Sequence, residues 1–145
     1  RCGCSACARD HVRAPMIFNK IFAAGGIDAV MGPVDIPPEQ LKDGVNGLLA
    51  LGNFEGAAVT IPHELPLAEL CDELGPGAKA ADAVNAVRFD ADGRLYGDNF
   101  DGHGFVAGLL GENPAGEAPE DILNNKSILI VGAFHKYCIM NAINR

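Results

Sequence analysis

The sequence lacks both a long apolar segment and an excess of basic residues. No apolar run approaches the roughly 20 residues that a membrane-spanning helix needs, so we expect no membrane partner. Lys and Arg number 11 against 19 Asp and Glu, which gives a net charge of -8. Nucleic acids and anionic membranes attract basic surfaces. This acidic balance therefore argues against nucleic-acid binding.

An initiator methionine, a signal peptide and a disulfide framework are also lacking. The chain begins with the letters RCGC, and no apolar stretch of the signal-peptide type follows. We expect residues 1–10 to be a disordered or non-native end. Five cysteines are an odd count, and Cys71 and Cys138 are isolated in apolar surroundings. These features favour a reducing, cytoplasmic location.

A metal site has little support in the sequence. Cys2, Cys4 and Cys7 form a C-x-C-x-x-C cluster that a soft metal could use. No second pair of ligands stands at the spacing of a zinc finger. We therefore expect no bound metal.

Helical patterns alternate with short apolar runs in this chain of 145 residues, which is long enough for one domain or for one domain and a fragment. Helices are expected at 15–24, 37–49, 62–74 and 101–110, and strands at 29–36, 56–61, 84–89, 94–96 and 127–133. The turn at 90–93 (DADG) predicts a hairpin between two of these strands. The alternation predicts an α/β fold with a mainly parallel sheet flanked by helices.

Polar side chains gather where the expected strands end. Thr60, His63 and Glu64 follow the buried run that begins at residue 56. Further polar residues stand at nearby loop or strand-end positions, namely Asn85, Asn99 and Asp101. Ligands of parallel sheets bind at the carboxyl ends of strands. The pattern therefore predicts a polar pocket at this edge.

Several separated motifs, in order along the chain, resemble the shikimate/quinate dehydrogenase family. The stretches that match its substrate-binding domain are APMIFN at 14–19, VTIPHE at 59–64, AVNAV at 83–87 and GDNFDGHGF at 97–105. The stretch SILIVGA at 127–133 resembles the first strand of the family's dinucleotide-binding domain. The resemblance implies a substrate-binding catalytic domain at 11–111, a linker at 112–126 and a truncated start of a Rossmann domain at 127–145.

The resemblance also implies a reaction and its partners. Members of the family oxidise shikimate to 3-dehydroshikimate, in the pathway to chorismate and the aromatic amino acids, and pass hydride to NADP or NAD. The expected partner is a small cyclic polyol carboxylate such as shikimate or quinate, with a homodimer as a candidate assembly. In such sites a lysine paired with an aspartate handles the hydroxyl proton.

Three positions of the sequence match the residues that the family uses in its site. Thr60 and Asn85 match a threonine and an asparagine that hold the substrate, and Asp101 matches the aspartate of the catalytic pair. Asp is also a favoured N-cap residue, so spacing alone leaves Asp101 open between a helix cap and a catalytic role. Asn85 and Thr60 have similar structural alternatives.

Four other positions depart from the family pattern. Val12 and Ala14 stand where two substrate-binding serines are expected, Phe100 replaces a threonine, and Glu64 occupies the slot of the catalytic lysine. A carboxylate at 64 could act as a base, but it places no positive charge against a developing alkoxide. It could also only stabilise the first turn of a helix, by about 0.3–1 kcal/mol.

The expected dinucleotide-binding loop departs from the pattern as well. Gly132 and Ala133 are the candidate cofactor-binding residues, but FHKYC follows them where a glycine-rich turn is expected. Glycines there let the backbone approach a pyrophosphate at a helix N-terminus. We therefore expect a shikimate-type dehydrogenase that is impaired. The alternative is a non-catalytic pseudoenzyme or small-polyol-binding fragment.

Overall fold

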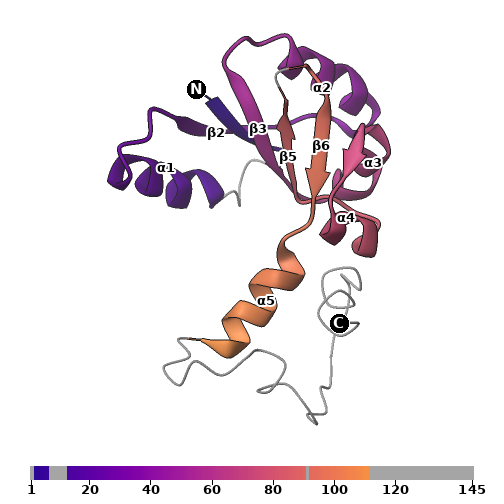
Figure 1. Ribbon diagram of the computed structural model, residues 1–145. Helices are drawn as coiled ribbons and strands as arrows, with labels where there is room; N and C mark the ends of the chain where they lie inside the picture. Colours follow the sequence, from indigo (N-terminus) through magenta and orange to yellow (C-terminus); the bar gives the residue numbers. More distant parts are fainter. Residues whose placement is uncertain (1, 7–12, 91, 112–145) are drawn as a thin grey trace.

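The computed structural model describes residues 2–6, 13–90 and 92–111, and these build one six-stranded sheet with helices around it (Figure 1). The strands are β1 (Cys2–Ala6), β2 (Val30–Val34), β3 (Phe54–Val59), β4 (Glu73–Leu74), β5 (Ala86–Phe89) and β6 (Leu95–Asp98). The helices are α1 (Ala14–Ala24), the 3-10 helix η1 (Pro38–Gln40), α2 (Leu41–Leu49), α3 (Glu64–Leu70), α4 (Pro76–Ala81) and α5 (Asp101–Leu110).

The sheet is mixed, with the order β2-β1-β3-β5-β6-β4. Strand β1 pairs in parallel with β2 and β3, and β4 pairs in parallel with β6. Strand β5 runs antiparallel to both of its neighbours, and its hairpin with β6 is the one that the DADG turn predicts. The prediction of an α/β fold with helices flanking the sheet is confirmed.

The expectation of a disordered N-terminal end is wrong for residues 2–6. This segment forms β1, which lies between β2 and β3 in the interior of the sheet. The sequence CGCSA contains neither a β-branched nor an aromatic residue, so strand propensity gives no signal there. The hydrogen-bonding edges of β2 and β3 on either side supply the pairing instead.

The helix predicted at 62–74 is shorter than expected. Helix α3 ends at Leu70, and the chain then forms the two-residue strand β4. The Gly75-Pro76-Gly77 sequence, expected only to stop a helix, begins α4 with proline in its first turn. Proline fits that position because its missing N–H would have no helical partner there.

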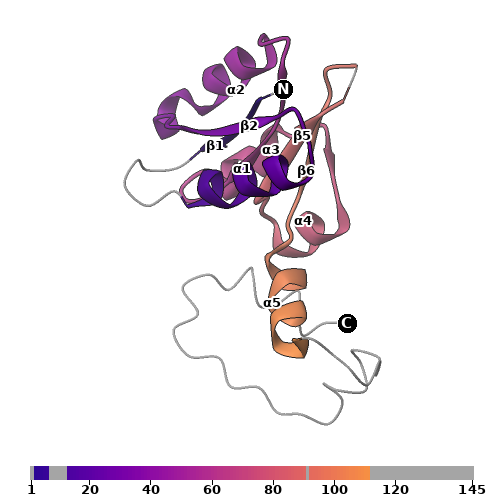
Figure 2. The ribbon, with the colours of Figure 1, turned by 90° about the vertical axis from the view of Figure 1, so that its left-hand side faces the viewer.

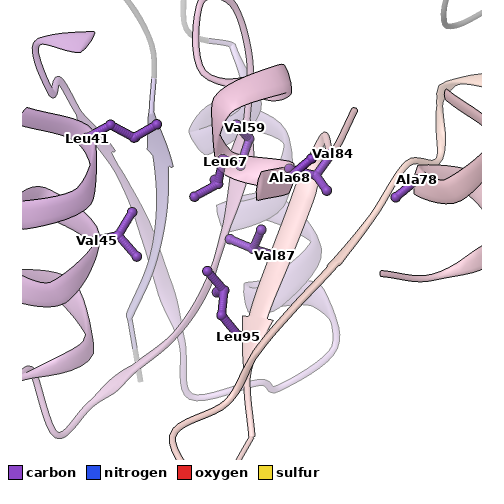
Figure 3. Packing of buried hydrophobic residues seen from close by; sticks show 9 residues of the cluster. All are labelled: Leu41, Val45, Val59, Leu67, Ala68, Ala78, Val84, Val87 and Leu95. Carbon is purple, nitrogen blue, oxygen red and sulfur yellow. The ribbon is translucent and has the colours of Figure 1, made fainter. Parts of the chain in front are cut away.

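The hydrophobic core lies where α2 and α3 pack on the central strands (Figure 3). Leu41 and Val45 extend from α2 toward the sheet, and Val84, which precedes β5, is fully buried. The other core members come from β3, α3, α4, β5 and β6: Val59, Leu67, Ala68, Ala78, Val87 and Leu95. This packing fixes the ends of β3 and β5 relative to each other.

Helix α1 lies beside the edge strand β2 (Figure 1). The Asn19 amide donates to the carbonyl of Met31 at 2.9 Å, and the Met31 N–H donates to Asn19 Oδ1 at 2.7 Å. The side chain thus closes part of the open edge of β2 as a neighbouring strand would. Helix α5 projects beyond the sheet in both views (Figures 1 and 2). In the described part of the chain, no helix combines the length and apolarity needed to span a membrane.

Gly77 has no room for a side chain. A Cβ there would collide with the backbone carbonyl of Asn99 and lie 2.9 Å from Asp98 Oδ1. We predict that Gly77→Ala lowers the free energy of unfolding by about 1–3 kcal/mol. In the control Gly47→Ala, on α2, nothing lies within 4 Å of the added Cβ. That change should raise stability by about 0.5–1 kcal/mol. Urea unfolding followed by circular dichroism checks both values, and equal effects of the two substitutions would contradict the packing.

Cys71 supplies a prediction about alkaline pH. Burial, aided by the negative charge of Asp72, raises the pKa of its thiol from 9.0 to about 11, and the Sγ atom donates to the Leu67 carbonyl at 3.3 Å. Between these two pKa values the unfolded chain loses the proton while the folded chain keeps it. The contribution of Cys71 to stability is therefore lost as pH rises through this window. Between pH ~8 and pH ~11, wild type should lose more stability than Cys71→Ser, which keeps a donor that does not titrate. Parallel stability profiles would refute this.

Candidate functional site

The candidate site is built on the corner between β3 and α3. Strand β3 ends at Val59, Thr60 and a cis Ile61–Pro62 peptide bond follow, and α3 begins at Glu64. The chain turns sharply here, as the strand-to-helix prediction at Pro62 requires. Thr60 and Glu64 are both half-buried and stand at opposite ends of the turn.

Two backbone hydrogen bonds join this corner to the start of β5. The Val59 N–H donates to the Asn85 carbonyl at 2.8 Å, and the Val84 N–H donates to the Glu64 carbonyl at 3.0 Å. The corner therefore holds residues 84 and 85 from both sides. As a result, Glu64 is hydrogen-bonded through its backbone to Val84, the residue before Asn85.

The side chain of Asn85 joins the corner to the start of α5. Its Nδ2 donates to Asp101 Oδ1 at 2.6 Å, and its Oδ1 accepts from the Phe100 N–H at 3.0 Å. An amide nitrogen carries two hydrogens, and in the described part of the chain no second acceptor contacts this one. Asn85 can thus hold Asp101 and donate to a bound hydroxyl at the same time.

The loop before α5 is held by buried polar groups. Asp98 Oδ1 accepts from the N–H groups of Ala78 and Asn99, at 2.9 and 2.8 Å. Asn99, which is 3% exposed, donates to the Ala83 carbonyl at 3.3 Å and accepts from the Asp101 N–H at 3.2 Å. These bonds fix the backbone that carries Asp101. Burial of the Asp98 carboxylate is possible because backbone donors replace its hydration.

His63 is a structural part of the corner. The ring is 3% exposed, and Nε2 lies 2.9 Å from the carbonyl of Ile36, in the loop after β2. That contact requires a hydrogen on Nε2, while Nδ1 is buried and has no hydrogen-bond partner among the described residues. The ring therefore ties the corner to the loop after β2.

The structure brings some of the sequence-predicted site residues together and leaves others apart. Asn85 and Asp101 are in direct contact, and the corner that carries Thr60 and Glu64 is bonded to Asn85 and its neighbour. Ala14 is the first residue of α1, which packs on the edge strand β2. Three other predicted residues lie outside the described residues: Val12, Gly132 and Ala133.

The sequence argument missed the supporting role of Asp98. Nothing in its spacing distinguishes it from the exposed acids around it, because its burial depends on the packing of α4 against β6. Among the described residues, no cluster of three or more His, Cys, Asp or Glu side chains is placed to bind a metal ion.

Comparison with known proteins assigns the family. Residues 8–87 match the model of the shikimate dehydrogenase substrate binding domain. The chain belongs to this family. Its relatives include the NADP(+) shikimate dehydrogenase of Rubrobacter xylanophilus, 42% identical over 123 residues, which cover 85% of this chain and 40% of the relative. The enzyme of Methanopyrus kandleri is 42% identical over 103 residues, 71% of this chain and 35% of the relative.

Solved structures of shikimate dehydrogenases share the fold. The enzyme from Listeria monocytogenes, in complex with shikimate and NAD, is 34% identical with a TM-score of 0.69, over 80% of this chain and 38% of that one. The enzyme from Aquifex aeolicus is 33% identical with a TM-score of 0.70, over 78% of this chain and 42% of that one. The chain thus spans about two-fifths of the length of the relatives that it matches.

The contact between Asn85 and Asp101 yields a prediction about stability and pH. Asn85→Asp places two carboxylates in contact, so folding raises the pKa of one of them. Stability should therefore fall as pH rises through the unfolded value near 4. We expect a loss of about 1–3 kcal/mol at neutral pH and a smaller loss below pH ~4. Chemical unfolding at both pH values measures this.

The double variant Asn85→Asp/Asp101→Asn provides the decisive control. It restores one donor and one acceptor across the same pair and should recover part of the loss. Asn46→Asp, at an exposed position of α2, makes the same change of charge away from the pair and should have little effect. If the double variant is no more stable than Asn85→Asp, the side-chain bond does not stabilise the fold as argued.

Proposed function

We propose that this chain forms the substrate-binding part of an NAD(P)-dependent dehydrogenase of the shikimate type, with impaired proton transfer. The observation that carries the proposal is the 2.6 Å bond between Asn85 and Asp101 beside the corner that bears Thr60 and Glu64. The substrate would be a cyclic polyol carboxylate. The family assignment and the shikimate complex of the Listeria monocytogenes relative support that substrate class.

The polar groups of the corner suit a polyol. Asn85 can donate an N–H to a ring hydroxyl while its other contacts hold Asp101. The Thr60 hydroxyl can donate and accept at the end of β3. Asp101 is exposed, and its carboxylate can accept a hydroxyl proton as general base. Each of these groups is placed by backbone that the core and the Asp98 loop hold in position.

Glu64 is the feature that we expect to slow the reaction. Removal of a hydride and a proton from an alcohol develops negative charge on the oxygen, and a nearby cation stabilises that charge. Glu64 carries the opposite charge. Its carboxylate lies in the first turn of α3, where the helix dipole stabilises it. The residue therefore suits the fold better than it suits the chemistry.

The dinucleotide part of the proposal rests on the family alone. NADP or NAD, when bound, would accept the hydride. The residues that the sequence predicts to contact it, Gly132 and Ala133, lie outside the described residues. The proposed limits of the substrate-binding domain are 11–111, followed by a linker at 112–126 and the start of a dinucleotide-binding domain at 127–145.

A second candidate function is a polyol-binding module without redox activity. The substitutions at 64, on the corner, and at 100, at the start of α5, favour it. Such a module would bind shikimate but produce no reduced dinucleotide from shikimate and NADP. A dehydrogenase with slow proton transfer would produce it at a measurable rate.

Calorimetric titration with shikimate tests the proposed site through charge reversal at position 64. Two unit charges about 4 Å apart interact by about 1–4 kcal/mol at a protein surface. We therefore predict that Glu64→Lys binds the shikimate anion about tenfold more tightly than wild type. Glu69→Lys is the matched control, because it makes the same change of charge at an exposed position of the same helix. Its affinity should stay within about twofold of wild type, since exposed charges at a distance are screened.

Two results would count against the proposed function. One is the absence of shikimate binding by both wild type and Glu64→Lys. The other is an equal gain in affinity for the two lysine variants, since this would assign the effect to net charge rather than to the corner. Repeating the titrations at high salt checks the second result, because screening weakens a long-range effect of net charge more than a partly buried local interaction.

A further inference from the structure

We propose that Phe100 sets the substrate specificity of the corner by replacing a hydrogen-bonding partner with an aromatic face. The preferred ligand would then be a cyclohexene or cyclohexane carboxylate that lacks the ring hydroxyl facing position 100. This inference rests on the proposed function, because it names the substrate class of the same site. It concerns the recognition of one hydroxyl and no chemical step.

The backbone of Phe100 belongs to the hydrogen-bond network of the site. Its N–H donates to Asn85 Oδ1 at 3.0 Å, and the next residue, Asp101, accepts from the amide of the same asparagine at 2.6 Å. The side chain is nevertheless 55% exposed. Isolated apolar side chains on a surface need no explanation. Here, however, the backbone of the residue is bonded to Asn85, which we assign to polyol binding.

The backbone that carries Phe100 is fixed, although its ring is exposed. Its carbonyl accepts from the Gly104 N–H at 2.9 Å, which makes it the N-cap of α5. The preceding residue, Asn99, is 3% exposed and bonded on both sides. The backbone atoms to which the ring is attached are therefore held in place by hydrogen bonds. The fold thus keeps an aromatic side chain at the start of α5, next in sequence to Asp101.

The chemistry at this position favours a ligand with fewer hydroxyls. A ligand hydroxyl that loses its water on binding and meets only an aromatic face is left without a hydrogen bond, which is unfavourable. The C–H edge of a deoxygenated ring carries no such penalty and gains apolar contact with the ring. A site that hydrogen-bonds a ligand hydroxyl strongly rejects the analogue that lacks this hydroxyl, because the polar groups of the site are then left unpaired. Phe100 should reverse that preference for one hydroxyl of the ligand.

The test compares shikimate with the set of analogues that each lack one ring hydroxyl, by calorimetric titration. Wild type should bind one of these analogues at least as tightly as shikimate. Phe100→Thr supplies a hydroxyl partner. This variant should bind shikimate about fivefold to tenfold more tightly than it binds that same analogue. Phe100→Leu keeps an apolar group and should retain the wild-type order of affinities.

Phe105→Thr is the matched control, since Phe105 is also an exposed phenylalanine, 39% exposed, but lies inside α5, more than one turn beyond Phe100. It should leave the affinity ratios unchanged. If shikimate and the analogues bind but Phe100→Thr leaves every ratio within about twofold of wild type, the role of Phe100 is refuted while the proposed function stands. If no ligand binds to any variant, the proposed function fails and this inference fails with it. Thermal unfolding of each variant shows that the fold is retained.

Discussion

The hydrogen bonds of Asn85 are the constraint on which the rest of the site depends. Its carbonyl accepts from the end of β3, its amide nitrogen donates to Asp101, and its amide oxygen accepts from the N–H of Phe100. One residue thus connects a strand, a loop and a helix that are distant in sequence. Because main-chain and side-chain bonds act together, a shift of any one of these elements strains the others. The position of Asp101 is therefore a property of the fold and not of a flexible loop.

The fold and the chemistry make separate demands on position 64. The fold uses the carbonyl of Glu64, which accepts from the N–H of Val84, and this bond is the same for any side chain. The first turn of α3 favours a carboxylate by about 0.3–1 kcal/mol. A lysine there would lose that small gain but would supply a cation to a bound anion. Replacement of one by the other can therefore change the reactivity of the site while the corner stays intact.

Sequence reasoning located the main elements because their signals are local. Helix α5 begins and ends where the pattern predicted, at Asp101 and Leu110, and the DADG turn predicted the β5–β6 hairpin. The sequence predicted Asn85 and Asp101 in one polar pocket, and the structure brings them into contact because β5 is antiparallel to β3 and β6, so that its amino end lies at the edge where those strands end. Residue types at strand ends thus carry positional information over long sequence distances.

The features that sequence reasoning missed depend on tertiary contacts. Strand β1 has small residues without strand propensity and forms through its two neighbours. Helix α3 stops early because the short strand β4 pairs with β6, a contact that no local pattern encodes. Asp98 is similar, since its buried oxygen binds backbone groups of α4 and of its own loop. In each case a distant partner decided between conformations that the local sequence allowed.

Two departures from the family pattern, Glu64 and Phe100, supply backbone groups to the hydrogen bonds that hold the site. Any residue other than proline supplies the same N–H and carbonyl groups. The residues whose side chains build the frame, Asn85, Asp98 and Asn99, keep chemistry that suits their bonds. The backbone hydrogen bonds at 64 and 100 are therefore available whichever side chain stands there, apart from proline. This separation explains how a substrate site can change its charge and polarity while its geometry is retained.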